Sequence, residues 1–229
     1  FVFFQHQGAS ALALVRACEA LADDPQLTAR PEHGQFLPPL RVVLDARLRT
    51  LERARVREGD APTLYLHDAA LAAPCLEGAE FATAPLGEDG RFDLHAVMAL
   101  LGARGINEVH VEAGPTLCGA LLKAGLADEL LLYIAPLLMG DGAQPLLAGL
   151  GIEHMAQAVP LEVVDARRVG KDLRVLLRRA AHLRWERLQA EAGKGAGTGK
   201  SNRLHCQIAF SSAHGNHTCF AAGAAPARL

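Results

Sequence analysis

The sequence has no long hydrophobic run, few aromatic residues and little net charge. No apolar stretch approaches the roughly 20 residues of a membrane-spanning helix, so no membrane span is expected. Aromatic residues make up 5% of the 229 residues and hydrophobic residues 50%, so a sizeable aliphatic core is available. The formal net charge of −2 excludes the strongly basic composition of a general nucleic-acid binder.

Cysteines are few, and the standard catalytic motifs are absent. The five cysteines form no CxxC pair, so we expect no disulfide framework and a reducing, cytoplasmic setting. There is no GxSxG elbow, no HExxH motif and no nucleophile with an evident partner. This pattern favours a reaction whose chemistry a cofactor supplies, such as hydride transfer. The chain opens with Phe1 and has no signal-peptide pattern, so we expect a fragment.

Strand-like and helix-like segments alternate over the first 180 residues. Short apolar, β-branched runs predict strands, and apolar residues spaced three or four apart predict helices. The expected strands are 40–45, 62–67, 80–84, 107–112, 128–136, 161–168 and 171–179. The expected helices are 9–22, 93–105 and 116–125. This order predicts a three-layer α/β domain, in which helices flank a mixed, mostly parallel sheet that ends in a C-terminal antiparallel hairpin.

The composition changes beyond the predicted hairpin. Residues 1–180 are expected to form the α/β domain, and 181–229 a helical extension followed by a disordered tail. From Gly193 onward, few large aliphatic residues remain to offset the entropy of ordering the chain. Residues 195–201 resemble a phosphate-binding P-loop, but Lys194 occupies the position of its first glycine. The histidines and cysteines of the tail match no standard zinc spacing, so no metal site is expected.

The most informative stretch is 112–120, EAGPTLCGA, where a buried strand gives way to a helix. Ligands of open α/β sheets bind beyond the carboxyl ends of strands, where the next helix offers N–H groups and the positive end of its dipole. Gly114 lets the backbone approach a phosphate, Thr116 can cap the helix or donate to an oxygen, and Gly119 lets the helix pack closely on its sheet or on a ligand. A glycine turn before a capped helix explains the spacing equally well. Glu112 is either a surface carboxylate or an acceptor for the hydroxyl groups of a ligand.

Two further segments carry candidate ligand contacts. Asp23 lies in an Asp-Asp-Pro turn, and Arg30 is either a ligand for a phosphate or carboxylate, or a solvated side chain. Arg47 and Arg49 follow the expected strand 40–45, where they could meet the 2′-phosphate of NADPH.

Four blocks together resemble a known family: 21–30, 39–50, 107–147 and 171–179. They are similar, in order, to the reductase domain of the bifunctional riboflavin-biosynthesis deaminase–reductase. The resemblance implies a dihydrofolate-reductase-like fold and the NADPH-dependent reduction of 5-amino-6-(5-phosphoribosylamino)uracil to its ribitylamino counterpart. It also implies a homodimer, and a deaminase domain on the full-length chain.

The resemblance assigns roles by motif and names no catalytic residue. The cofactor-binding residues that it implies are Asp23, Gly114, Pro115, Thr116, Leu117, Cys118, Gly119 and Ala120. The substrate-binding residues that it implies are Leu27, Arg30 and Glu112, with Arg30 at the substrate phosphate.

The sequence departs from the family pattern at its start. The family's opening strand with its Ser-Leu-Asp-Gly element is absent there, which leaves a sheet position and one wall of the substrate pocket unfilled. Ala17-Cys18-Glu19 replaces the usual glycine–threonine element, and Ala46 replaces a common serine. Two alternatives therefore stay open. One is an inactive remnant that at most binds NADPH or dimerises, and the other is a related reductase of another pyrimidine or a pterin.

Overall fold

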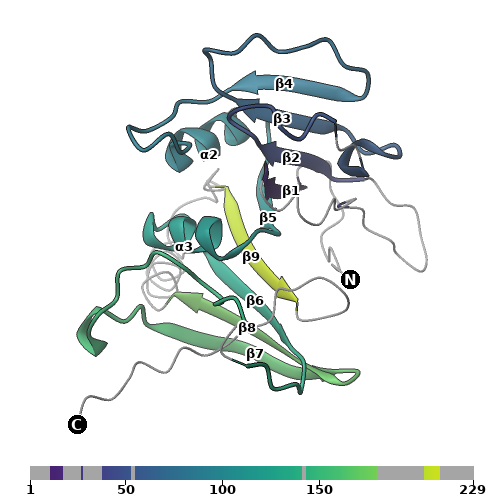
Figure 1. Cartoon of the computed structure of the whole chain (residues 1–229). Helices are drawn as coiled ribbons and strands as arrows, with labels where there is room; N and C mark the ends of the chain where they lie inside the picture. Colours follow the sequence, from purple (N-terminus) through teal and green to yellow (C-terminus); the bar gives the residue numbers. More distant parts are fainter. Residues whose placement is uncertain are drawn as a thin grey trace, which may run out of the picture. The chain divides into compact units, whose positions relative to one another are not determined.

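The chain divides into two compact units in a computed structural model. The structure describes residues 11–17, 27, 38–52, 55–140, 143–179 and 204–211. The first unit comprises residues 1–113 and 197–207, and the second comprises 114–196 and 208–229. Figure 1 shows the strands and helices of both units.

The first unit is built on parallel strands in the order β4-β3-β2-β1-β5. Their bounds are β1 Ala11–Arg16, β2 Leu40–Leu44, β3 Thr63–His67, β4 Ala79–Thr83 and β5 Glu108–Val111. Among the described residues, η1 (Arg55–Arg57) and α2 (Leu94–Ala103) accompany them. Because all five strands run in the same direction, their carboxyl ends lie at one edge of the sheet, which is where ligands of such sheets bind.

The predicted helix over residues 9–22 is wrong at residues 11–16, which form β1. Ala17 is helical, and residues 9, 10 and 18–22 lie outside the described residues. This strand pairs with β2 on one side and with β5 on the other. Ala13, Leu14 and Val15 are each at most 1% exposed, so both faces of the strand are covered. A strand buried on both faces has no polar face, and its short apolar run resembles a helical segment in sequence.

One face of the parallel strands carries an apolar cluster that is covered by the segment after β2. The buried members of the cluster are Ala13, Val15, Leu27, Val43, Val56 and Tyr65. Arg41, also fully buried, donates from its guanidinium to the carbonyl of Glu58 at 2.8 Å and to that of Ala61. These two bonds tie the loop that contains η1 to the strands, and they satisfy donors of a buried cation.

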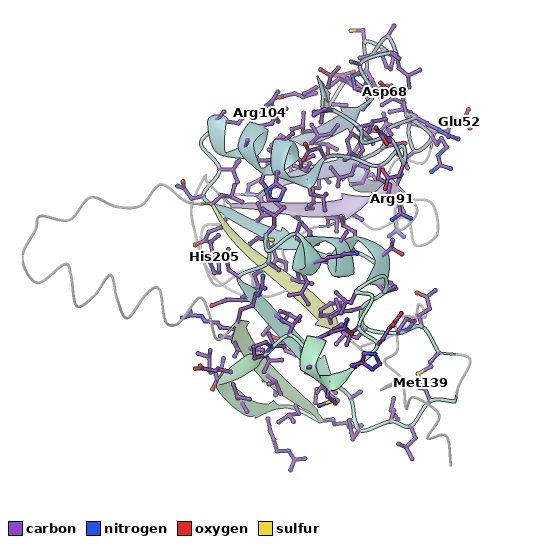
Figure 2. The ribbon with its side chains drawn as sticks, turned by 90° about the vertical axis from the view of Figure 1, so that its left-hand side faces the viewer. Glu52, Asp68, Arg91, Arg104, Met139 and His205 are labelled. Atoms are coloured by element: carbon purple, nitrogen blue, oxygen red, sulfur yellow. The ribbon has the colours of Figure 1, made fainter. Side chains whose placement is uncertain are left out.

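Helix α2 begins and ends at clear local signals. Its N-cap, Asp93, accepts from the amides of His95 and Ala96 at 2.9 and 3.1 Å. The chain turns at Gly105, whose φ of 81° favours glycine. Arg104, labelled in Figure 2, donates to the carboxylate of Glu80 at 3.0 Å. The sequence prediction of a helix here is confirmed.

In the described part of the second unit, a helix accompanies antiparallel strands in the order β6-β8-β7. Its elements are α3 Pro115–Lys123, β6 Glu129–Ile134, η2 Met155–Gln157, β7 Leu161–Val169 and β8 Asp172–Arg179. The predicted hairpin is confirmed, with Gly170 at a φ of 61° in its turn. On the neighbouring pair, Arg178 of β8 donates to the buried carboxylate of Glu129 of β6 at 2.6 Å.

A last strand, β9 (His205–Ser211, yellow in Figure 1), lies within the segment where no strand was predicted. Residues 204–207 belong to the first unit and residues 208–211 to the second, and in the strand order β9 neighbours β5 and β6. The rest of the predicted extension and tail, 180–203 and 212–229, lies outside the described residues, and the expected domain boundary at 180 stays a prediction.

The predicted α/β class is confirmed, with a mixed, mostly parallel sheet and an antiparallel hairpin. Among the helices that the structure describes, none has the length and apolar character needed to cross a membrane.

Candidate functional site

The first group of candidate residues, in the first unit, is centred on Glu112, at the carboxyl end of β5. The Glu112 amide donates to the carbonyl of Leu14 at 3.0 Å, so the pairing with β1 continues to this residue. The register pairs His110 with Ala13 and Val111 with Leu14. Glu112 and His110 therefore share the face on which Ala13 joins the apolar cluster, since alternate residues of a strand point the same way.

Burial governs the protonation of both side chains on this face. It raises the pKa of the Glu112 carboxyl from its usual 4.5 to about 7. It lowers the pKa of the His110 imidazole to about 4, and a hydrogen bond with Gln207 opposes part of that shift. At neutral pH His110 is consequently neutral, while Glu112 lies close to its midpoint and can either donate or accept a hydrogen bond.

A second group of polar residues follows β2 at the same edge of the first unit. Asp45 is 1% exposed, and its carboxylate accepts from both the amide and the hydroxyl of Thr50 at 2.8 Å. It also accepts from the Arg47 amide at 3.3 Å. These bonds fix the loop, and they leave Arg47 and Arg49 exposed. The two arginines are thus exposed cations, and their contact with a 2′-phosphate stays a prediction.

In the second unit, the amino end of α3 forms the predicted glycine turn. Gly114 is the N-cap, in extended backbone at φ −68° and ψ 171°, and Pro115 occupies the first turn. No side chain caps this end, so of the two roles considered for Thr116, capping is not observed. Leu117 and Cys118 are buried and anchor the helix, whereas Pro115 and Thr116 are partly exposed. The amides of Thr116 and Leu117 precede the first hydrogen bond of the helix itself, and such amides suit an anion.

Gly119 packs closely, but against a segment that the sequence did not indicate. A Cβ added at Gly119 would lie 2.0 Å from the carbonyl oxygen of Ala148. The amide of Ala148 also donates to the carbonyl of Pro115 at 3.0 Å. Gly119 was expected to pack on its sheet or on a ligand. Instead, the space that its missing side chain leaves is filled by the backbone of Ala148.

The remaining predicted site residues lie apart from these groups or outside the described residues. Leu27 is 8% exposed and belongs to the apolar cluster of the first unit, at a φ of 47° that is uncommon for leucine. Its predicted contact with substrate stays a prediction. Asp23 and Arg30 lie outside the described residues.

The sequence analysis did not identify His110, which shares a strand face with Glu112, or Ala148, which contacts Gly119 of α3. The alternation Glu-Val-His-Val-Glu over residues 108–112 is a usable signal for His110, because it predicts one polar and one apolar face. Nothing local indicates Ala148, which meets α3 through the tertiary fold. In the part of the chain that the structure describes, no group of three or more His, Cys, Asp or Glu side chains could hold a metal ion.

Comparisons with known proteins give a consistent result. The family model of the RibD C-terminal domain matches residues 6–175. The riboflavin biosynthesis protein RibD of Escherichia coli K12 is 36% identical over 171 residues, covering 70% of this chain and 46% of that protein. The 2,5-diamino-6-ribosylamino-4(3H)-pyrimidinone 5′-phosphate reductase of Methanothermobacter thermautotrophicus is 35% identical, covering 70% of this chain and 79% of that protein.

Solved structures agree with the sequence matches. RibD of Acinetobacter baumannii is 26% identical with a TM-score of 0.60, covering 75% of this chain and 47% of that one. A Thermotoga maritima protein described as a diaminohydroxyphosphoribosylaminopyrimidine deaminase/5-amino-6-(5-phosphoribosylamino)uracil reductase is 25% identical with a TM-score of 0.59, covering 75% of this chain and 46% of that one. The chain spans about half the length of the RibD proteins that it matches.

Proposed function

The chain belongs to the family of the RibD C-terminal domain, and on that premise we propose that it reduces 5-amino-6-(5-phosphoribosylamino)uracil to 5-amino-6-(5-phosphoribitylamino)uracil in riboflavin biosynthesis, with NADPH as the reductant. The similarity to a reductase of which the chain covers 79% supports the reaction class. A deaminase domain on the full-length protein, a homodimer and a cytoplasmic location are parts of the same proposal. The Thermotoga relative, whose description names both activities, supports the deaminase.

The observation that carries the proposal is the sequence of elements at residues 108–123. Buried strand β5 ends at Val111, Glu112 follows it, and helix α3 starts at Pro115 after its N-cap Gly114, with no capping side chain. No side chain caps the amides at the start of α3, and Pro115 and Thr116 are partly exposed. This helix end therefore fits the diphosphate of a dinucleotide. The amides of Thr116 and Leu117 would hold that group. In the first unit, the exposed guanidinium groups of Arg47 and Arg49 suit a phosphate.

NADPH, when bound, would supply a hydride to C1 of the open-chain imine of the ribose, so that the C=N double bond becomes a single bond and the nitrogen takes a proton from water or a nearby acid. Binding and orienting the reactants would fall to the protein. Placing the reacting carbon correctly accounts for most of the rate, through proximity and orientation. We assign Glu112 to the ribose hydroxyls, where a carboxyl with a pKa of about 7 can donate or accept a hydrogen bond. Arg30, by resemblance, takes the phosphate.

The test begins with cofactor affinity. Gly114→Asp places a carboxylate at the N-cap of α3, where aspartate favours the helix but repels a diphosphate. We expect NADPH affinity, measured by fluorescence titration, to fall at least about 10-fold. Gly140→Asp adds the same charge at an exposed glycine of the second unit with open space around it, and it should leave the affinity unchanged. Equal affinities for both variants and the parent chain would contradict the proposed diphosphate site.

Turnover then separates the proposed activity from its alternatives. NADPH oxidation is followed with the phosphoribosylamino-uracil and, separately, with a dihydropterin. Oxidation with the first substrate alone supports the proposal, and preference for the pterin favours the related reductase. NADPH binding without oxidation of either favours the inactive remnant.

A further inference from the structure

Strand β9 comes from the far end of the chain, yet it extends the pairing of β5. In the first unit, the amide of His205 donates to the carbonyl of Asn107 at 2.7 Å, and His205 is labelled in Figure 2. Cys206, the next residue, is 1% exposed. The side chain of Gln207 is hydrogen-bonded to the buried His110 of β5. Backbone and side-chain contacts therefore both hold the start of β9 to β5.

The opposite edge of β5 is already used. Residues 108–111 pair with 11–14 of β1. With β9 removed, the second edge of β5 would present N–H and C=O groups without strand partners, which is a surface that accepts another strand. β9 thus occupies a strand-binding edge that the rest of the first unit does not fill.

Side chains of β9 alternate in burial. Ile208 is 0% exposed and Phe210 6%, and they alternate with the less buried Gln207 and Ala209. This two-residue period is that of a strand with one fully buried face. The segment thus has the pattern of a peptide that adds to a sheet, with main-chain bonds for affinity and alternate side chains for specificity.

The connection to β9 is long. β8 ends at Arg179 and β9 begins at His205, so the whole of 180–204 lies between them. The sequence of this stretch from Gly193 onward predicts no packed core of its own. A long connection of this kind keeps the strand near its binding edge at an effective concentration on the order of millimolar. No short turn joins β9 directly to β5.

We propose that the edge of β5 opposite β1 is a binding site for an extended peptide and that residues 204–211 of the same chain are its exchangeable occupant. The strand is separable from the rest of the protein: it can leave this edge, and it can be replaced by a peptide of the same sequence added in trans.

The test starts from the full-length chain with a site for a specific protease inserted after Gly193. The folded protein is purified, cut, and run on a native gel-filtration column with a fluorescent peptide spanning 203–213. We expect the C-terminal fragment to stay with the body after cutting and to be replaced by excess peptide over time. A peptide carrying Ile208→Asp should be incorporated at least about 10-fold less, because it places a charge in a buried position.

Three results would overturn the proposal. One is release of the C-terminal fragment on cutting while the thermal midpoint of the body stays unchanged. Another is equal incorporation of the parent and Ile208→Asp peptides. The third is precipitation of the cut protein even when the parent peptide is added. If the added peptide prevents precipitation, the result instead supports the proposal, because the body then depends on the strand.

A cross-link decides whether the occupant comes from the same chain. Asn107→Cys and His205→Cys are combined in the full-length protein, which is oxidised with glutathione disulfide and run on a non-reducing denaturing gel, beside the Asn107→Cys single variant. A cross-linked species of monomer mass, absent from the single variant, is expected. A covalent dimer specific to the double variant would show that a second copy supplies the strand and would overturn the assignment to the same chain.

Discussion

Replacing Gly119 with alanine should destabilise the protein, although the same change in an ordinary helix stabilises it. Alanine is favoured over glycine inside a helix by about 1 kcal/mol. At Gly119, however, the new methyl group would lie 2.0 Å from the carbonyl oxygen of Ala148, and 3.0 and 3.1 Å from that residue's carbonyl carbon and nitrogen. All three atoms are backbone, so no side-chain rotation can relieve the overlap.

The size of the effect follows from what has to move. With the added Cβ only 2.0 Å from the carbonyl oxygen of Ala148, α3 and the segment at Ala148 would have to separate by roughly an ångström or more. That movement would also strain the hydrogen bond from the Ala148 amide to the Pro115 carbonyl. Overpacking of a tight site costs about 1–3 kcal/mol, and a backbone obstacle places Gly119→Ala at the upper end. After the helix propensity is subtracted, we expect a net loss of about 2 kcal/mol.

Gly102 of α2 provides a matched control. It is a helical, exposed glycine, and a Cβ added there meets nothing within 4 Å. Gly102→Ala should therefore stabilise the protein by about 0.5–1 kcal/mol. Thermal unfolding of the parent and both variants measures the difference, and a chain of this size shifts by roughly 2–4 °C per kcal/mol. Gly119→Ala should melt about 4–8 °C below the parent, and Gly102→Ala slightly above it.

A midpoint for Gly119→Ala equal to or above that of Gly102→Ala would refute the reasoning, since it would mean that α3 does not pack against Ala148. A lower midpoint should be accompanied by weaker NADPH binding, because the overlap displaces the turn that begins at Gly114.

Two further predictions concern charge. Because burial raises the folded-state pKa of Glu112 from 4.5 to about 7, the folded protein binds the proton more tightly than the unfolded chain, and stability should fall as the pH rises from about 4.5 through 7 by at most about 3 kcal/mol. Glu112→Gln should remove that loss, so the thermal midpoints of the variant and the parent should agree near pH 4.5, and the variant should melt higher at pH 8. The same dependence of the midpoint on pH in both proteins would contradict this prediction. Arg178→Met leaves the 7% exposed carboxylate of Glu129 without its 2.6 Å partner and should cost about 3 kcal/mol in urea unfolding. Arg167→Met breaks a 3.6 Å ion pair with Asp165, in which the two side chains are 53% and 40% exposed, and it should change stability by less than about 1 kcal/mol. Similar losses for the Arg178 and Arg167 variants would show that burial does not set the difference.

Local signals in the sequence were sufficient for the stretch from β5 to α3 and for the hairpin. Residues 108–112 alternate strictly, Gly-Pro marks the start of the helix, and Gly170 marks the tight turn. Each of these features depends on backbone preferences within a few residues, so it can be recognised without knowing what packs against it.

Strand β1 shows where such signals fail. Its six residues, ALALVR, are apolar enough to be buried in either conformation, and periodicity cannot separate a short buried strand from a helical turn. Pairing with β2 and β5 decided the outcome, and those partners lie far along the chain.

The sequence by itself determined the α/β class, the position of the glycine turn before α3 and, by resemblance, the family. Only the tertiary structure decided that residues 205–211 pair beside β5, that Gly119 meets Ala148, and that Glu112 and His110 titrate far from their usual pKa values. The physical reason is the same in all three cases. Strand partners, close approaches and desolvation are set by residues distant in sequence, whereas turns and caps are set by their immediate neighbours.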